Sequence, residues 1–320
     1  MYTIGIDLGG TNIAVGLCDE KLNIIDKISA PTDAKRASEM IVKDMASLSK
    51  KLIDRNNLNE SDIEFVGIAA PGTVDPISGV VEYSNNIRMS NFRITEEFKK
   101  HLNLPVYLAN DANAAALGEA LGGCGKGSGS LVMITLGTGV GGGVIIDGKI
   151  LTGSANTAGA ELGHTVIEKG GRQCSCGRRG CWEAYSSASA LTAMTAEKMK
   201  ELSLKGVPSL LFDEEKREGR LSARTSFNAM KRGDKYGKEL VDTYVSYLAD
   251  GITNMINIFQ PKILCIGGGV SGEGNTLLAP LSALVDRDQY TRDNKSKTKL
   301  VIATLGNDAG IIGAAALGKS

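Results

Sequence analysis

Short apolar runs that stop at glycine or proline clusters recur along the chain and predict its strands. They cover residues 2–8, 13–18, 22–28, 65–70, 106–109, 130–136, 144–146 and 263–266. The first two runs are joined by so tight a turn that their strands must be antiparallel. The same pattern, two strands around a glycine loop at 137–143, returns near residue 135. This loose internal repeat predicts two domains of related plan with a cleft between them.

Apolar positions at helical spacing predict helices over 38–56 and 240–259. A third helix is expected within "NDANAAALGEAL", which opens with Asn and Asp and continues with strong helix formers. The Ala-rich segment 308–317 predicts a closing helix. The charged segment 198–237 is expected to form solvated helices or an insertion.

Length and charge narrow the class of protein. A chain of 320 residues exceeds the size at which single cores stop growing, which favours two domains. Lys plus Arg and Asp plus Glu are equal at 36 each, so no bulk positive field favours nucleic acid or an anionic membrane. No apolar run approaches membrane-spanning length, and a predicted strand takes the place of a signal peptide. We therefore expect a cytoplasmic protein.

Two glycine turns follow predicted strands and are candidate phosphate loops. "DLGGTN" (7–12) and "LGTGVGGG" (136–143) would let backbone N–H groups approach a phosphate, and Asp7 could hold Mg²⁺ directly or through water. Neither is a Walker A loop or a Rossmann fingerprint, because no Gly-Lys-Ser/Thr follows and the next element is a strand. Either loop alone reads more simply as a hairpin turn. "GGGVS" (267–271) could contact adenosine or serve as a plain connection.

Asn110 and Asp111 lie where a predicted strand gives way to a helix. Asn and Asp favour helix N-caps, which is the simpler interpretation. Phosphoryl transfer often needs a carboxylate that accepts the proton of the attacking hydroxyl, and Asp111 is the best-placed candidate.

Three cysteines and a histidine form the most specific pattern. Cys174, Cys176 and Cys181, with His164 ten residues earlier, would make a closed tetrahedral site, which indicates structural zinc rather than catalytic metal. Disulfides are the less favoured alternative, and Cys18, Cys124 and Cys265 are expected to be buried free thiols.

We expect the zinc to act as a clip. It would fix Glu161, His164 and Glu183 as a polar wall for a polyhydroxy substrate. A zinc module for nucleic acid would need aromatic platforms, and Trp182 is the only aromatic residue between the cysteines and Tyr185.

Together these motifs resemble the ROK family of bacterial sugar kinases and repressors. The matching pieces are "GIDLGGTN", "APG" at 70–72, "NDANAAALGE", "LGTGVGGG", "ELGH", "CSCGRRGCWE", "IGGGVS" and "DAGIIGAAALG". The resemblance implies an α/β chain with the actin-like ATPase (ribonuclease H-like) two-domain fold and an interdomain cleft. Residues 1–109 with 306–320 would form the smaller domain, and 110–305 the larger domain with the zinc site.

The resemblance also implies roles for particular residues. Those facing the nucleotide phosphates would be Asp7, Gly9, Gly10, Thr11, Asn12, Gly137, Thr138 and Gly139, with Gly268 and Gly269 beside the adenosine. Asp111 would be the general base on the sugar 6-hydroxyl. The other sugar contacts would be Gly72, Asn86, Asn110, Glu161, His164 and Glu183. His164, Cys174, Cys176 and Cys181 would bind zinc.

The implied activity is transfer of the ATP γ-phosphoryl group to a hexose, with Mg²⁺, in a homodimer or higher homo-oligomer. Glucose is the expected acceptor; N-acetylmannosamine, mannose, fructose and allose are alternatives. Two departures, "SNNIRMSNF" after "APG" and Ala160 in place of glycine, bear on which hexose binds. The alternative from another class is a sugar-sensing repressor without catalysis. Such repressors carry an N-terminal helix-turn-helix domain, for which the strand from residue 2 leaves no room.

Overall fold

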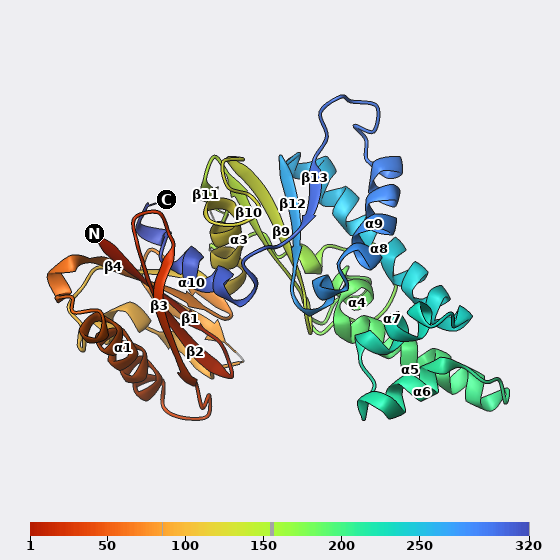
Figure 1. Cartoon of the computed structure of the whole chain (residues 1–320), viewed down its shortest axis with the longest axis horizontal. Coiled ribbons are helices and arrows are strands. Elements are labelled where there is room, and N and C mark those ends of the chain that lie inside the picture. Colours follow the sequence, from red (N-terminus) through yellow and green to blue (C-terminus); the bar gives the residue numbers. More distant parts are fainter. Residues whose placement is uncertain (85, 154–156, 320) are drawn as a thin grey trace. The chain divides into compact units, whose positions relative to one another are not determined.

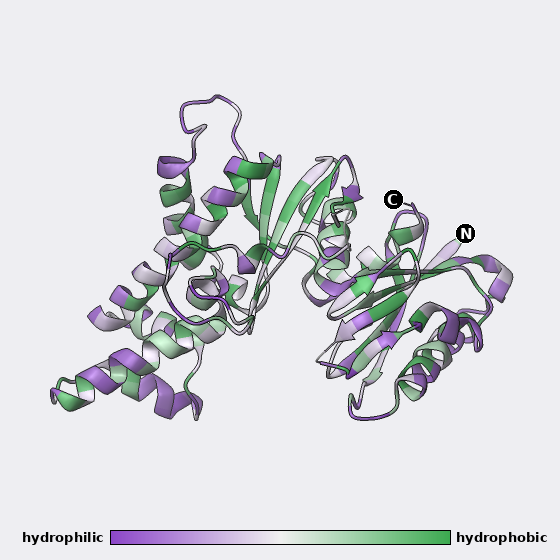
Figure 2. Ribbon diagram, turned by 180° about the vertical axis from the view of Figure 1, so that it is seen from behind, coloured by the Kyte–Doolittle hydropathy of each residue, from purple (hydrophilic) through white to green (hydrophobic). Residues whose placement is uncertain are grey.

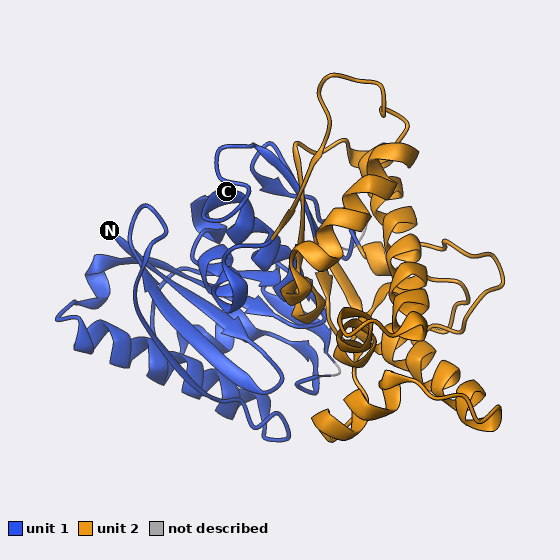
Figure 3. Cartoon of the chain, turned by 45° about the vertical axis from the view of Figure 1, so that its right-hand side comes forward, with its two compact units in different colours: residues 1–133, 143–160, 303–320 blue, residues 134–142, 161–302 orange. Residues whose placement is uncertain are grey.

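The structure is a computed structural model that describes residues 1–84, 86–153 and 157–319. The chain forms two compact units (Figure 3). Unit 1 contains residues 1–133, 143–160 and 303–320, and unit 2 contains residues 134–142 and 161–302. The domain division expected from the sequence, 1–109 with 306–320 against 110–305, stays a prediction.

Unit 1 is built on a five-stranded sheet in the order β3-β2-β1-β4-β8 (Figure 1). Its strands are β1 (Tyr2–Leu8), β2 (Asn12–Cys18), β3 (Ile24–Pro31), β4 (Ile63–Ala70) and β8 (Val106–Asn110). The hairpin β1–β2 is antiparallel, as predicted, and β1, β4 and β8 are parallel neighbours. The third strand begins two residues later than predicted. Leu22 has a φ of 64° in a turn where the Asp19 side chain accepts hydrogen bonds from the N–H groups of Lys21 and Asn23.

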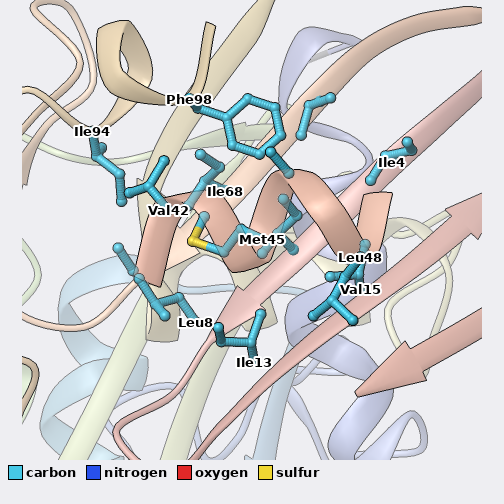
Figure 4. Packing of buried hydrophobic residues seen from close by; sticks show 14 of the residues in the cluster. Ile4, Leu8, Ile13, Val15, Val42, Met45, Leu48, Ile68, Ile94 and Phe98 are labelled. Carbon is cyan, nitrogen blue, oxygen red and sulfur yellow. The ribbon is translucent and has the colours of Figure 1, made fainter. Parts of the chain in front are cut away.

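Hydrophobic side chains from this sheet pack against helices α1 (Ser38–Arg55) and α2 (Ile94–Lys99). Figure 4 shows Phe98, Ile68, Val42 and Met45 pointing toward one another in this cluster. Apart from Met40, which is exposed, the apolar positions whose spacing predicts α1 lie on its buried face.

Glycines bring helix α10 (Ala309–Ala314) against the same sheet. A Cβ on Gly5 would overlap the carbonyl oxygen of Ile311, and a Cβ on Gly67 would overlap that of Ala314. A Cβ on Gly313 would likewise overlap the Ala114 carbonyl in α3 (Asp111–Leu121). The predicted closing helix 308–317 is shorter than expected, with a 3₁₀ turn, η5 (Leu317–Lys319), after it.

A small three-stranded sheet in unit 1 has no counterpart among the predicted elements. Its order is β5-β6-β7, with β5 (Thr73–Asp75), β6 (Val80–Ser84) and β7 (Met89–Phe92). Strands of three to five residues with mixed exposure leave too short a pattern to detect in the sequence.

A second five-stranded sheet has the order β11-β10-β9-β12-β13. Its strands are β9 (Ser130–Leu136), β10 (Val140–Ile146), β11 (Lys149–Ile150), β12 (Ile263–Gly267) and β13 (Lys299–Ile302). The order repeats that of the first sheet strand for strand, which confirms the internal repeat. The boundary between the units passes through β9 and β10.

The predicted glycine loop 137–143 is wrong at its second half, because β10 begins at Val140. Gly143 lies inside the strand, where a Cβ would stand 2.5 Å from the Cβ of Ala116. Its glycine therefore serves close packing of strand and helix, and the open turn is limited to 137–139.

The remaining helices of unit 2 are α4 (Glu183–Ser186), α5 (Ala188–Leu204), α6 (Leu210–Glu218), α7 (Ala223–Lys231), α8 (Lys235–Phe259) and α9 (Asn275–Asp288). The charged segment 198–237 is helical, as expected, yet it buries Leu211 and Phe227. Figure 2 shows hydrophobic and hydrophilic residues mixed along α5 and α6. Among the described residues, no helix has both the length and the apolar character to cross a membrane.

Candidate active site

The carboxyl ends of three parallel strands carry the candidate residues of unit 1. Asp7 lies at the end of β1, Gly72 follows β4, and Asn110 and Asp111 come at the end of β8. In the sheet register Asp7 is beside Ala69, and Ala70 is beside Asn110. Carboxyl ends of neighbouring parallel strands form the usual ligand-binding edge of an α/β sheet.

Asp7 is a carboxylate with a raised pKa at this edge. Burial, and after it the charge of Asp111, raises the pKa of Asp7 to about 6. Gly310 of α10 leaves room for this side chain, because a Cβ there would lie 2.7 Å from Asp7 Cγ. Gly310 was not among the residues predicted to contribute to the site, although it belongs to the "DAGIIG" motif. Neighbouring carboxylates at a strand edge are suited to Mg²⁺, which would relieve their repulsion.

The first glycine turn is held in place by hydrogen bonds. Gly9 N–H donates to the Asn12 carbonyl at 2.9 Å, which closes the turn. Thr32, directly after β3, donates its hydroxyl to Gly9 O at 2.6 Å, and its N–H donates to Thr11 O at 2.8 Å. Gly10, Thr11 and Asn12 are exposed. The turn is therefore held in one shape while its outer face stays open to a ligand. Thr32 was not among the predicted residues.

Asn110 is the N-cap of α3, as the simpler interpretation held. Its Oδ1 accepts hydrogen bonds from Ala112 N at 2.9 Å and Asn113 N at 3.2 Å, and its Nδ2 donates to Gly72 O at 3.0 Å. Gly72 has a φ of 96° and no space for a Cβ beside Tyr83. The strand ends of β4 and β8 are thus tied together at the helix N-terminus.

Asp111 and Asn86 complete the candidate set of unit 1. Asp111 is half-exposed in the first turn of α3, and its Oδ1 accepts from Ala112 N at 2.8 Å. Asn86 is exposed in the turn after β6, and its Cβ is 3.4 Å from the Cβ position of Gly10. The structure therefore brings Asn86 beside the first glycine turn.

In unit 2, the second glycine turn is held by residues from farther along the chain. Gly137 N–H donates to Gly139 O at 3.0 Å, and Ala188 N–H donates to Gly137 O at 2.9 Å. Val140 N–H donates to Glu183 Oε2 at 3.1 Å. Thr138 is exposed at the tip.

The predicted metal ligands lie together in the same unit. One ligand atom from each of His164, Cys174, Cys176 and Cys181 lies within 4.8 Å of all the others. Cys176 Sγ is 3.7 Å from Cys181 Sγ, and Cys174 Sγ is 3.7 Å from His164 Nδ1. Zinc–sulfur bonds of about 2.3 Å in a tetrahedron put sulfur atoms about 3.8 Å apart, so the donor set fits a Zn²⁺ ion.

None of the six cysteines forms a disulfide bond in the structure. Cys18 and Cys265 are buried, as expected, but Cys124 is only half-buried. It follows Gly123 in a surface turn, where its N–H donates to the Glu119 carboxylate. That turn is the reason why the expected burial of Cys124 is wrong.

The other candidate residues of unit 2 are Gly268, Gly269 and Glu161, and they differ in how closely other atoms surround them. Gly268 has a φ of 82°, and a Cβ would lie 2.6 Å from Leu136 N and O, so its glycine is required for packing against the end of β9. Gly269 has open space around its Cβ position. Glu161 is exposed directly before the 3₁₀ turn η2 (Leu162–His164).

The fold and these turns match a known class. The family model "ROK family" matches residues 3–320, and the chain belongs to this family. It has the actin-like ATPase fold of ROK sugar kinases, in agreement with its two sheets of equal strand order.

Relatives of known activity cover nearly the whole chain. A glucokinase from Thermotoga maritima is 38% identical over 98% of this chain and 96% of its own length. A glucokinase from Halalkalibacterium halodurans is 36% identical over 98% of this chain and 93% of its own. The solved structure of a ROK family glucokinase from Streptomyces griseus, in complex with glucose and AMPPNP, has a TM-score of 0.78 and 32% identity over 99% of both chains.

Proposed function

We propose that this chain is an ATP-dependent hexose kinase that phosphorylates glucose. The observation that carries the proposal is the constellation at the carboxyl ends of β1, β4 and β8. There a glycine turn held by Thr32 occurs together with Asp7, whose pKa is raised by burial and by the charge of Asp111, in a chain that full-length glucokinases resemble.

The chemistry follows from these groups. The 6-hydroxyl oxygen of glucose attacks the γ-phosphorus of ATP, the bond from that phosphorus to the β–γ bridging oxygen breaks, and ADP leaves. Asp111 accepts the hydroxyl proton as general base. Asp7 binds Mg²⁺, directly or through water, and the ion neutralises charge on the phosphates when bound.

The nucleotide is held by backbone more than by side chains. The phosphates lie against Gly9, Gly10, Thr11, Asn12 and the turn Gly137–Thr138–Gly139. This proposal is supported by the exposure of Gly10, Thr11, Asn12 and Thr138 and by the open space at the Cβ position of Gly137. Gly268 and Gly269 lie beside the adenosine, where the open space at Gly269 supports a close approach.

The proposed partners of the sugar hydroxyls are Gly72, Asn86, Asn110, Asp111, Glu161, His164 and Glu183. For His164, the Nδ1 atom faces Cys174, which leaves Nε2 for a sugar hydroxyl.

The cluster of His164, Cys174, Cys176 and Cys181 binds a structural Zn²⁺. The sulfur and nitrogen spacings support this choice, as does the soft, four-ligand donor set with no open position. The enzyme works as a homodimer or higher homo-oligomer in the cytoplasm.

The experiment that tests the function measures ADP release with MgATP across glucose, mannose, fructose, allose, N-acetylglucosamine and N-acetylmannosamine. A kcat/KM for glucose at least tenfold above every other sugar supports the proposal. A preference for another hexose would make that hexose the substrate in place of glucose. Absence of turnover with all six sugars, together with tight sugar binding, would instead favour a sugar-sensing protein.

A further inference from the structure

The Glu183 carboxylate touches two elements that the proposed function treats separately. Its Oε2 accepts a hydrogen bond from Val140 N at 3.1 Å, directly after the second glycine turn. Its Oε1 accepts from the Ser175 hydroxyl at 3.0 Å, and Cys174 Sγ lies 3.6 Å from the same oxygen. One side chain therefore reaches both the turn and the metal cluster.

The residues around Glu183 accommodate its contacts with both the turn and the metal cluster. A side chain on Gly139 would overlap Glu183 Oε2, so glycine at this position makes room for the carboxylate. Ser175 stands between two of the metal ligands, Cys174 and Cys176, and its position is set by both. The second tie on the turn, from Ala188 N to Gly137 O, comes five residues after Glu183.

Geometry explains why the bridge depends on the metal. Cys174 and Cys176 flank Ser175 and are two of the four proposed ligands, so a bound ion would fix the backbone that presents the Ser175 hydroxyl to Glu183. Removing the metal releases this constraint and weakens the hydrogen bond that orients Glu183 toward Val140.

We infer that Glu183 is a positioning residue that couples the metal cluster to the glycine turn 137–139, so that metal occupancy sets nucleotide affinity. The inference rests on the proposed function for the role of the turn. It goes beyond a sugar contact, and the two are compatible, because a carboxylate has about four acceptor sites and the two protein bonds use two.

The first test needs no ligand. The backbone amide resonance of Val140 in a ¹H–¹⁵N spectrum reports its hydrogen bond to the carboxylate. We expect it to shift when zinc is removed by a chelator and when Ser175→Ala is made. Ser203→Ala, at an exposed serine on α5, is the matched control and leaves the resonance in place. If neither zinc removal nor Ser175→Ala shifts the Val140 resonance, the proposed coupling is wrong.

The second test separates the nucleotide from the sugar. In Glu183→Ala we expect the Kd for Mg–AMPPNP to rise about tenfold, because both bonds are lost. In Glu183→Gln the rise stays within about threefold, since the amide oxygen can accept from Val140 and the amide nitrogen can donate to Ser175. Ser175→Ala, which removes one of the two bonds and leaves the Glu183 side chain in place, raises this Kd about threefold.

The outcomes are distinguishable from failure of the proposed function. If the wild-type chain binds no Mg–AMPPNP, the kinase assignment fails, whatever the Val140 resonance does. If it binds Mg–AMPPNP and Glu183→Ala leaves this Kd unchanged while weakening glucose, Glu183 is a sugar contact alone and the coupling is wrong.

Discussion

The two five-stranded sheets share one strand order, yet their first glycine turns are held by different means. In the first sheet, Thr32 holds the turn through two bonds, and it comes from the end of the neighbouring strand β3. In the second sheet, Glu183 and Ala188 hold the turn, and both follow the metal-ligand segment. The repeated backbone plan decides where an open glycine turn occurs, whereas segments that differ between the two sheets decide what stabilises it.

The turns also differ in charge. The first strand ends in Ile6-Asp7-Leu8-Gly9, and its counterpart ends in Ile134-Thr135-Leu136-Gly137. The first turn therefore has a carboxylate directly before it and the second has a hydroxyl at the matching position. The acid chemistry of the proposed reaction and its Mg²⁺ site belong to the first sheet, whereas dependence on zinc belongs to the second.

The largest effect is expected from removing Asp111, the proposed general base, which follows β8 of the first sheet. Asp111→Ala should lower kcat by about 10²–10⁴-fold, because the general base is lost, while the Kd for glucose changes little. Steady-state kinetics and calorimetry measure the two quantities. Asp54→Ala, at an exposed aspartate on α1, is the control. An unchanged kcat in Asp111→Ala would refute the base role.

Breaking the metal cluster should act on the second sheet. Wild-type protein should contain about one zinc per chain, and Cys176→Ser should lose it and weaken glucose binding by about 10–100-fold, since Glu161, His164 and Glu183 lose their support. Elemental analysis and calorimetry provide the check. Cys124→Ser, outside the cluster, should retain the metal. If wild-type protein contains no zinc, the hypothesis that zinc fixes Glu161, His164 and Glu183 is wrong.

Close packing by α10 is a feature of the first sheet. In Gly67→Ala the new Cβ would overlap the Ala314 carbonyl, so the free energy of unfolding should fall by about 1–3 kcal/mol. Gly272→Ala, whose Cβ position has open space, should stay within about 0.5 kcal/mol of wild type. Urea denaturation followed by circular dichroism measures both, and equal losses in the two variants would contradict the packing argument.

Asp7 should make the stability of the first sheet depend on pH. Its folded pKa of about 6 lies above the ordinary 3.8, so the folded chain binds this proton more tightly than the unfolded chain does. The Asp7 contribution to stability is therefore fully present below pH 4 and is lost as pH rises through 6.

The comparison with Asp7→Asn isolates this contribution. Between pH 5 and 7.5 in the absence of Mg²⁺, wild type should lose about 1 kcal/mol more free energy of unfolding than Asp7→Asn. Parallel pH profiles for the two proteins would show that the carboxyl is not perturbed.

The long elements were predictable from the sequence because their signals are strong. β1 has the predicted bounds, and α1 differs by one residue at its end, since an unbroken apolar run and a helical stripe leave few alternatives. The cluster of His164, Cys174, Cys176 and Cys181 was predictable because its spacing is specific, and the structure brings all four residues together.

What the sequence missed depends on contacts between distant residues. Thr32 and Gly310 reach the first turn and Asp7 from 23 and 303 positions away, and a lone threonine or glycine carries no local pattern. The glycines of 137–143 look alike in the sequence. Only the helix packed against Gly143 separates a packing glycine from one in the open turn.

The smallest predicted effect tests whether the first turn is independent of the metal. Thr32→Val keeps the shape of a fully buried side chain and removes its hydrogen bond to Gly9 O, which should cost about 1 kcal/mol of stability and weaken Mg–AMPPNP binding about fivefold. Because Thr32 belongs to its own sheet, the same fivefold ratio to wild type should persist after zinc is chelated from both proteins. Thr243→Val, on an exposed face of α8, is the control. A ratio that vanishes on chelation would mean that the two turns act as one unit, and the distinction between a turn held by its sheet and a turn held by a metal segment would be lost.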